Sequence, residues 1–387
     1  MDRLQSSSGE FDLERVPLRP KQPLRAWDAA DEFALEDFAA NPAGSVATVV
    51  LVGDSFGALT CALRDRDPVS VNESAAGAEA IAANLARNSL EELEVYSMLD
   101  LETLTDPIDH VIVKIPKSAS ELVDILHRLR PHLHAGTRIV GAAMAKHIHS
   151  STIEHFENII GPTTTSLARK KARLVHSTFD YALAAGSNPW PETWSAEGST
   201  LVNHGGGFSP SAIDVGTRFL LASVPSFADF VPATGEPLRI VDLGCGNGII
   251  GLRAARDLSE RSINFVLDAV DDSALALDAA ERSWEATLPG AAAEQVAFRH
   301  HHRLIEVVPK RSVDLVMVNP PFHDDRVVGD DTAWSMFTDS HKVLRPGGSL
   351  LVVGNRHLAY HAKLKKIFGK VDTIASNKKF VVLRAFR

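Results

Sequence analysis

One stretch of this chain occurs twice in a recognisable form, and that repetition restricts the folds open to it. Residues 46–60 (VATVVLVGDSFGALT) and 238–252 (LRIVDLGCGNGIIGL) are both apolar, β-branched segments that run into a glycine turn. The correspondence continues downstream, where 110–117 pairs with 315–322 and 137–149 pairs with 349–361. Similarity at this spacing predicts an internal duplication of about 150 residues.

Each half alternates short apolar strands with helical patterns, which is typical of parallel strands joined by helices. The sequence therefore predicts an α/β fold with two tandem Rossmann-like domains, each built on a mainly parallel, doubly wound sheet. The length of 387 residues suits two such cores. Residues 185–194 are rich in turn formers, so we expect domains at 1–190 and 191–387.

The composition excludes several classes of protein. No apolar stretch approaches the roughly 20 residues of a membrane span, and the first residues lack the apolar core of a secretory signal, so we expect a cytoplasmic protein. Cys61 and Cys245 are too few for a disulfide scaffold or a thiolate metal cage, and no metal is expected. The net charge of −9 opposes nucleic-acid binding through the overall field, but basic residues gather at 169–173 and 363–387.

The second glycine turn has the features of a ligand-binding loop. Its glycines let bare backbone N–H groups approach a ligand, and residues 246–251 also fit the G-x-G-x-x-G fingerprint of a nicotinamide-cofactor site. Asp242 separates the two interpretations, because its carboxylate would repel a pyrophosphate and attract a ligand with an amino group and a sulfonium. S-adenosylmethionine is such a ligand. We expect it to be bound by Asp242, Gly244, Gly246, Asn247 and Gly248.

The next predicted strand ends in two further carboxylates. We expect Asp271 to accept hydrogen bonds from the ribose hydroxyls of the cofactor, with Asp272 beside it. A helix N-cap is the competing role, and it suits Asp272 or Ser273 better than Asp271. Three adjacent histidines at 300–302 resemble a metal tract, but neighbouring strand residues point to opposite faces and no further ligand completes a set. We instead expect one of them near the adenine.

The segment Asn319-Pro320-Pro321-Phe322 follows an apolar strand and predicts the chemistry. Prolines fix the backbone and cannot donate, so the carbonyl of Pro320 and the side-chain oxygen of Asn319 can converge as two acceptors. An exocyclic amine of a nucleobase has two hydrogens for them, which turns its lone pair toward an electrophilic methyl group held in line. Phe322 would stack on the base once it leaves its own stack. We therefore expect Asn319, Pro320 and Phe322 to be catalytic, and Asn319 also to contact the cofactor.

These motifs resemble those of the bacterial ribosomal-RNA guanine-N2 methyltransferases of the RlmG and RsmC type. The residues that carry the resemblance are the loop 319–323, the turn 242–248, Phe208-Ser209 and Asp214-Val-Gly-Thr-Arg218. Segments 331–334, 354–358, 363–369 and 377–383, with 161–165 and 170–173, are similar to the large-subunit branch. The resemblance implies two class I methyltransferase-type domains, a cofactor site in the second only, and a guanine N2 in 23S ribosomal RNA as target. It also places Phe208 and His323 beside that target.

The first copy of the repeat has lost these chemical groups. Leu51 stands where the second copy has Asp242, Ser55 where it has Gly246, and Lys114-Ile-Pro-Lys117 where it has residues 319–322. We therefore expect an RNA-binding first domain without a cofactor site. The lysines expected to contact RNA are Lys114, Lys117, Lys170 and Lys171.

Other functions stay open at this stage. Asn-Pro-Pro-aromatic loops also serve 16S guanine, adenine N6 and glutamine amides, so the acceptor is the least constrained part of the hypothesis. An NAD-dependent oxidoreductase using the turn 246–251, or a non-catalytic RNA-binding protein, are the remaining candidates.

Overall fold

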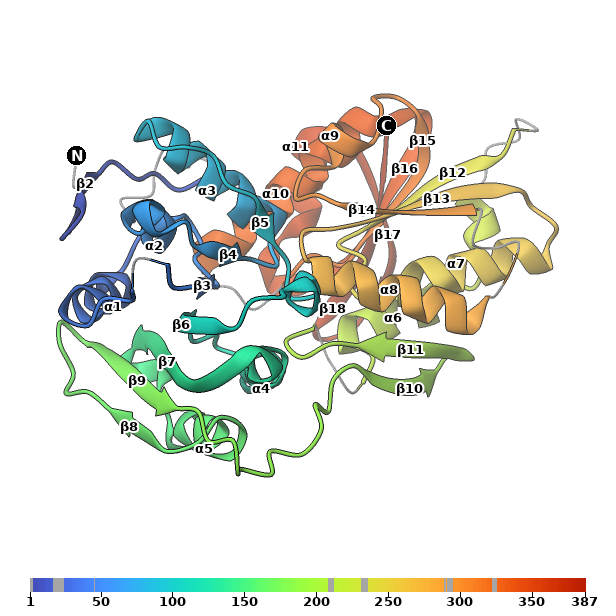
Figure 1. The fold of residues 1–387 in the computed structure, drawn as a ribbon. Coiled ribbons are helices and arrows are strands. Elements are labelled where there is room, and N and C mark those ends of the chain that lie inside the picture. Colours follow the sequence, from blue (N-terminus) through green and yellow to red (C-terminus); the bar gives the residue numbers. More distant parts are fainter. Residues whose placement is uncertain are drawn as a thin grey trace. The chain divides into compact units, whose positions relative to one another are not determined.

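The computed structural model describes residues 3–16, 24–44, 46–207, 212–230, 236–288, 290, 295–321 and 326–387. The chain divides into two compact units, Met1–Trp190 and Pro191–Arg387. Each is an α/β unit, and Figure 1 shows the first in blue to green and the second in yellow-green to red.

The first unit contains a sheet of seven strands in the order β5-β4-β3-β6-β7-β9-β8. These strands are β3 (Val49–Val52), β4 (Val69–Val71), β5 (Val95–Tyr96), β6 (Ile108–Lys114), β7 (Leu133–Met144), β8 (Thr163–Thr165) and β9 (Ala172–Thr178). The helices are α1 (Ala29–Ala40), α2 (Ala58–Ala62), α3 (Ala75–Arg87), α4 (Ala119–Leu129) and α5 (Ser150–Ile159), with 3-10 turns η1 (Arg64–Arg66), η2 (Asp100–Thr103), η3 (Arg130–His132) and η4 (Ala145–His147). A separate hairpin joins β1 (Leu4–Ser6) to β2 (Gly9–Phe11).

The second unit repeats this plan with the order β14-β13-β12-β15-β16-β18-β17. Its strands are β12 (Leu238–Leu243), β13 (Phe265–Asp271), β14 (Val296–His300), β15 (Val313–Val318), β16 (Leu344–Asn355), β17 (Lys370–Ser376) and β18 (Phe380–Phe386), after a hairpin of β10 (Glu192–Ala196) and β11 (Ser199–Asn203). The helices are α6 (Val215–Ser223), α7 (Ile249–Glu260), α8 (Ala274–Thr287), α9 (Leu304–Val307), α10 (Arg326–Val343) and α11 (Tyr360–Phe368), with η5 (Phe227–Phe230) and η7 (Arg356–Leu358).

The strand registers of the two sheets correspond as the repeat predicts. Leu51 of β3 pairs with Ile112 of β6, and Asp242 of β12 pairs with Met317 of β15. In both sheets the first five strands of the order are parallel, and only the last two pairings are antiparallel. The predicted α/β fold with two mainly parallel sheets is confirmed.

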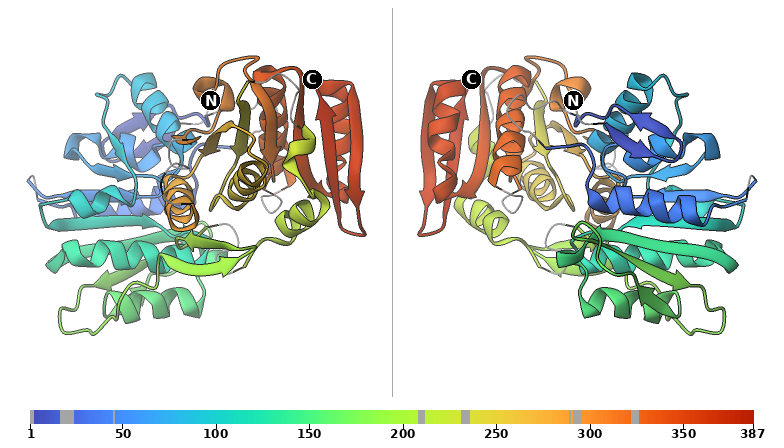
Figure 2. Two further views of the ribbon diagram at one scale, coloured as in Figure 1. Left: turned by 90° about the vertical axis from the view of Figure 1, so that its right-hand side faces the viewer. Right: turned by 90° about the vertical axis from the view of Figure 1, so that its left-hand side faces the viewer.

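The alternation of side chains along the strands explains why helices cover both faces of the sheet. In β15, Leu315 and Met317 pack in a core with α6, α7 and α8, whereas Val316 and Val318 pack in a core with α9, α10 and α11. The turned views of Figure 2 show the helices on either side of these strands. Both strand faces are buried, which is why these segments are almost continuously apolar in sequence.

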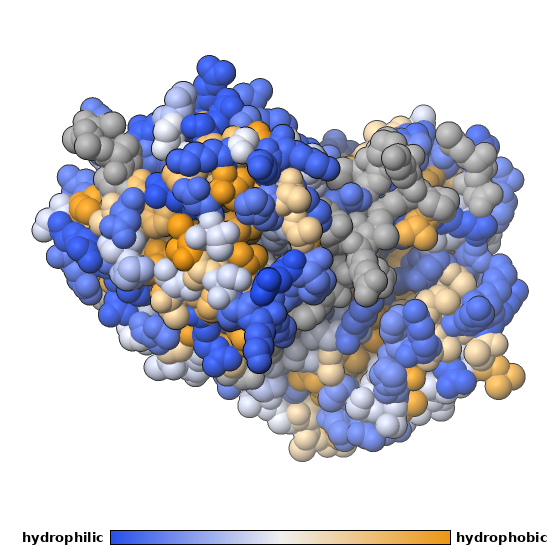
Figure 3. Space-filling view, turned by 180° about the vertical axis from the view of Figure 1, so that it is seen from behind, coloured by the Kyte–Doolittle hydropathy of each residue, from blue (hydrophilic) through white to orange (hydrophobic). Residues whose placement is uncertain are grey.

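Hydrophilic side chains predominate on the face shown in Figure 3, with apolar residues in smaller groups between them. Among the described residues, no helix is long and apolar enough to cross a membrane.

Candidate active site at the carboxyl edge of the second sheet

Three of the predicted groups meet because the strands that carry them are neighbours. Leu243, the last residue of β12, pairs with Val270 of β13 on one side and with Val318 of β15 on the other. Parallel strands lie about 4.8 Å apart and end at the same edge. The glycine turn that begins at Gly244 therefore lies between Asp271 and Asn319, and the structure brings these groups together.

The turn after β12 requires glycine for backbone reasons. Gly244, Gly246 and Gly248 have φ values of +69°, +55° and +80°, in the left-handed region that side chains disfavour. A Cβ on Gly248 would lie 3.3 Å from Cβ of Ala280, while a Cβ on Gly246 would meet no heavy atom within 4 Å. Gly246 thus faces open space, as a ligand-binding turn requires.

Asp242 lies beneath this turn. Its side chain is completely buried, and Oδ2 accepts a hydrogen bond of 2.8 Å from the backbone N–H of Gly251 in α7. Burial raises the pKa of Asp242 to about 7, and the hydrogen bond from Gly251 only partly offsets that effect. Oδ1 is also buried and accepts no hydrogen bond from a described residue. The carboxylate therefore anchors the turn from below.

Asp271 closes the turn from the neighbouring strand. Its Oδ2 accepts from the N–H of Gly246 at 2.9 Å, and its Oδ1 accepts from the N–H of Ser273 at 2.9 Å. Burial raises the pKa of Asp271 despite these bonds. Ser273 is the N-cap of α8, so the capping role falls to it, while the carbonyl of Asp272 bonds Nε2 of His300 at 2.9 Å. The backbone N–H of Asp272 also contributes to holding this carboxylate, which keeps only part of its acceptor capacity for a further donor.

The side chain of Asn319 has a defined orientation. Its Nδ2 donates to Oδ2 of Asp214 at 3.1 Å and to Oγ1 of Thr217 at 2.8 Å. Its Oδ1 is buried and accepts no hydrogen bond from a described residue. Pro320, the next residue, is also buried. Sequence reasoning gave Asp214 and Thr217 no role, although an Asp three residues before a Thr at a helix start is a recognisable N-cap pattern.

The segment after β11 is tied to the same turn. Oδ1 of Asn203 accepts from Nδ2 of Asn247 at 3.0 Å. Nε2 of His204, which is almost fully buried, lies 2.6 Å from Oδ2 of Asp278 in α8. Of the remaining predicted site residues in this unit, Phe208, Phe322 and His323 lie outside the described residues.

The lysines predicted in the first unit have unequal environments. Nζ of Lys114 bonds Oδ1 of Asp28 at 3.1 Å and Oδ1 of Asp31 at 2.5 Å. Burial by itself lowers the pKa of Lys114, but the two carboxylates outweigh burial and raise it. Nζ of Lys170 lies 2.6 Å from Oε2 of Glu32, whereas Lys117 and Lys171 are exposed and form no ion pair with a described residue.

The first unit fills its own copy of the glycine turn. Asp54, almost fully buried, accepts from the N–H groups of Gly57, Ala58 and Thr60 at 3.1, 2.9 and 2.8 Å and from Oγ1 of Thr60 at 2.8 Å. Thr60 N corresponds in the repeat to Gly251 N, which Asp242 serves in the second unit. In the first unit, which has Leu51 at the position of Asp242, Asp54 therefore accepts the backbone hydrogen bond that Asp242 accepts in the second unit.

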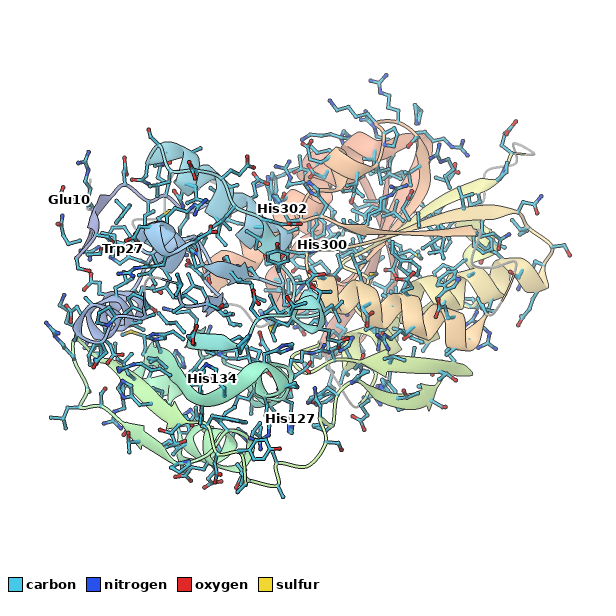
Figure 4. All side chains as sticks on the ribbon, in the orientation of Figure 1. Glu10, Trp27, His127, His134, His300 and His302 are labelled. Carbon is cyan, nitrogen blue, oxygen red and sulfur yellow. The ribbon has the colours of Figure 1, made fainter. Side chains whose placement is uncertain are left out.

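The histidine tract lies at the end of β14. Strand alternation stops with the strand at His300, and the rings of His301 and His302 are stacked with centroids 5.1 Å apart. Figure 4 labels His300 and His302 at this strand end. Among the described side chains, no group of three or more His, Cys, Asp or Glu could hold a metal ion.

A hollow of about 500 Å³ lies in the first unit, and its lining includes His127, Arg130, Phe179 and Tyr181. Arg130 is already engaged there, because its guanidinium donates to the carbonyls of Ile159 and Leu183, each at 2.6 Å. None of the predicted site residues lines this hollow.

Comparison with solved structures identifies the type of fold. A 16S rRNA N2 methyltransferase (RsmC) of T. Thermophilus, in complex with AdoMet and guanosine, superposes with a TM-score of 0.73 at 18% identity, covering 100% of this chain and 97% of that one. The family model of the methyltransferase small domain matches residues 198–384. The second unit, with its glycine turn and its Asn-Pro-Pro edge, is therefore a methyltransferase domain of the Rossmann-like class.

The family follows from the whole chain. Residues 1–181 match the model of the RLMG N-terminal domain. The chain is 44% identical to ribosomal RNA large subunit methyltransferase G of Streptomyces griseus, with 100% of both chains covered. It is 39% identical to the protein of the same name in Aeromonas hydrophila, with 97% of this chain and 96% of the other covered. The chain belongs to the family of ribosomal RNA large subunit methyltransferase G proteins.

Proposed function

We propose that this protein is an S-adenosylmethionine-dependent methyltransferase that modifies the exocyclic N2 of a guanine in 23S ribosomal RNA. The observation that carries the proposal is the placement of Asn319 directly beside the glycine turn, at the ends of the paired strands β12 and β15. A hydrogen-bond acceptor for an amine is thereby set next to a turn suited to the cofactor. The names of full-length relatives support the large ribosomal subunit as the source of the RNA.

The residues at this edge can prepare the amine for methyl transfer. The bound cofactor supplies an electrophilic methyl carbon on a sulfonium. Oδ1 of Asn319 and the carbonyl of Pro320 accept the two N–H hydrogens of the guanine amine, which directs its lone pair away from them. Holding that nitrogen in line with the methyl carbon would be the main source of rate. As the new N–C bond forms and the S–C bond breaks, one proton of the amine would pass to solvent. From the sequence alone, we expect Phe322 to stack on the base and Phe208 and His323 to contact it.

The residues around the glycine turn have different roles in cofactor binding. Gly246 offers the open approach to the turn, and Asn247 is fixed by Asn203. Asp271 binds the ribose hydroxyls through its remaining lone pairs, with Asp272 beside it. Asp242 acts through the turn that it anchors at Gly251, since its carboxylate is completely buried.

The first unit serves RNA binding and has no cofactor site of its own. Asp54 already occupies the N–H groups of its turn, and the Asn319 position carries Lys114 in an internal ion pair. RNA contact therefore falls mainly to Lys117 and Lys171, joined by Lys170, whose partner Glu32 can be exchanged for a phosphate at the surface. Lys114 is the least available of the four, because both of its partners lie close and its side chain is only 17% exposed.

The proposal is tested by methyl transfer to deproteinised 23S RNA from a strain that lacks the gene. Wild-type protein should place one methyl group on one guanine, identified by primer extension and by mass spectrometry as N2-methylguanosine. Asn319→Ala should lower kcat by about two orders of magnitude or more, because the amine loses an oriented acceptor, while cofactor affinity changes little.

DNA, 16S RNA and protein substrates serve as competing acceptors in the same assay. Methyl transfer to none of the ribosomal RNAs, or a product methylated at adenine N6 or a glutamine amide, would show the proposal to be wrong. An equal loss of cofactor affinity and of kcat in Asn319→Ala would contradict the role given to this side chain.

A further inference from the structure

We infer that Asp214 and Thr217, at the start of α6, are positioning residues that fix which side of the Asn319 amide presents oxygen to the target amine. The inference rests on the proposed function. It goes further by explaining how a neutral, freely rotatable amide is held as an acceptor, and it assigns that work to a helix that lies outside the sequence motif of the loop.

The hydrogen-bond chemistry determines the amide orientation. A carboxylate can only accept, so the amide atom that faces Oδ2 of Asp214 must be the NH2 group. Oγ1 of Thr217, at 2.8 Å, accepts the second hydrogen of the same group. Both donor hydrogens are then used, and Oδ1 is left on the opposite side with no described donor. Rotation of the amide by half a turn would place oxygen against the Asp214 carboxylate and lose that bond. The bond to Asp214 therefore fixes the orientation, and the Thr217 hydroxyl, which can donate or accept, adds a second contact to the same side.

Asp214 and Thr217 are themselves held by the helix. Asp214 is the N-cap of α6, and its Oδ2 accepts the backbone N–H of Thr217 at 2.9 Å as well as the amide of Asn319. Thr217 is buried. The two acceptors therefore belong to one capped helix turn, whose geometry does not depend on a long flexible side chain.

The first unit has the equivalent contact between a helix start and a strand end, but a lysine replaces the asparagine. Asp28 is the N-cap of α1, Asp31 lies three residues later, and both accept from Lys114 at the end of β6. In each repeat a helix N-cap and the residue three positions on accept hydrogen bonds from the residue at the end of the equivalent strand. This recurrence shows that the contact between helix start and strand end is a built feature of the fold.

The comparison also explains why asparagine suits position 319. An ammonium group has donors only, so Lys114 satisfies its two acceptors and has no acceptor left to present. An aspartate at the strand end would bring a second carboxylate against Asp214. Only an amide satisfies the acceptors on α6 with one side and presents an oxygen with the other.

The first experiment compares Thr217→Val with Thr217→Ser in the full-length protein. Valine has the shape of threonine but no acceptor, whereas serine keeps the hydroxyl. We expect Thr217→Val to lower kcat on 23S RNA about three- to tenfold, with little change in the Kd for S-adenosylmethionine or in Tm. Thr217→Ser should retain most of the activity. Equal kcat values for the two variants, or a loss in Thr217→Val that follows Tm, would overturn the inference.

The second experiment uses charge to test the contact with Asp214. Asn319→Asp places like charges together and should lose most activity. Adding Asp214→Asn removes one of those charges and should recover at least several-fold of the lost kcat, a coupling that independent effects cannot produce. If the double variant is no more active than Asn319→Asp, the proposed contact is not the one that positions residue 319.

A third experiment measures the Asn319 amide directly and does not depend on enzyme activity. In ¹⁵N-labelled protein, the side-chain amide signal of Asn319, assigned by its loss in Asn319→Asp, should exchange slowly with solvent and faster in Thr217→Val. Fast exchange in the wild type would contradict the inference whatever the activity. A wild-type protein that methylates no RNA would defeat the proposed function instead, so the two failures are distinguishable.

Discussion

At the scale of single residues, Asp242 of the second unit lies beneath the glycine turn rather than at its open side. Asp242 is completely buried and accepts a hydrogen bond from Gly251 of α7. Burial makes its ionised form unfavourable, so its contribution is the hydrogen bond that holds the start of α7. The group that we propose to contact the target amine is instead the neutral amide of Asn319. An amide can accept from an amine without having its own protonation state changed between pH 5 and pH 9, which suits a reaction that depends on positioning.

The raised pKa of Asp242 predicts a dependence of stability on pH. Its folded pKa of about 7 lies above the ordinary value of 3.8, so between these pH values the folded state binds more protons than the unfolded state. The contribution of Asp242 to the free energy of unfolding should therefore fall as pH rises from about 4 to 7, by at most about 1.4 kcal/mol per pH unit.

Asp242→Asn removes this titration and keeps an oxygen for the N–H of Gly251. Urea unfolding of both proteins at pH 5, 6, 7 and 8 should show the wild type losing stability relative to the variant as pH rises. A constant difference across this range would mean that Asp242 is ionised throughout.

At the scale of elements, the two units share one contact: a 3-10 turn after the fifth strand of the sheet order bonds to the hairpin formed by the last two strands. The turn and hairpin are η4 with β8–β9 in the first unit, and η7 with β17–β18 in the second. The N–H of Ala145 in η4 donates to the carbonyl of Lys171 at 2.7 Å, and the N–H of Arg356 in η7 donates to the carbonyl of Lys379 at 2.9 Å. Phe380 pairs with Asn355 at the end of β16, so Lys378 and Lys379 lie at the same edge of the sheet as Asn319. We therefore expect this hairpin to contact the RNA backbone beside the target.

Charge-reversal variants can distinguish a specific RNA contact of this hairpin from a general effect of net charge. Lys378→Glu with Lys379→Glu should weaken binding of 23S RNA fragments and reduce the slope of log affinity against log salt by about two. Cofactor affinity should stay unchanged. The matched control is Lys365→Glu with Lys366→Glu in the last turn of α11, which makes the same charge change toward the opposite edge of the sheet. Equal losses in the two double variants would contradict a specific role for the hairpin.

At the scale of the whole molecule, the two units have the same strand order and different turns. The turn after β12 keeps a bare approach at Gly246, while the turn after β3 is occupied by Asp54. In the first unit, Asp54 thus occupies N–H groups of the turn, and the strand-end position holds the ion pair of Lys114. The fold survives because the apolar strands are retained in both copies.

Hydrogen exchange of the full-length protein should report this difference. Adding S-adenosylmethionine should slow exchange in peptides covering 242–251 and 269–274, because a ligand that binds only the folded site suppresses local opening. Peptides covering 51–60 should exchange at unchanged rates in the same sample. Protection of both turns by the cofactor would contradict the assignment of a single cofactor site.

The internal repeat, the α/β class and the strand ends that carry the candidate groups could all be predicted from the sequence. Those properties depend on local patterns, because strand periodicity and glycine turns are encoded within a few residues of one another. The neighbouring strand ends of β12, β13 and β15 then follow from the topology that such patterns impose.

The hydrogen-bond partners of the polar side chains could not be predicted from the sequence. Lys114 finds its partners 83 and 86 residues away in the chain, and Asn319 finds Asp214 and Thr217 more than 100 residues away. A buried donor must be satisfied by whatever acceptor the packed fold brings near, and sequence spacing does not specify that acceptor. The same strand-end position thus holds an ion pair in one unit and an oriented acceptor in the other.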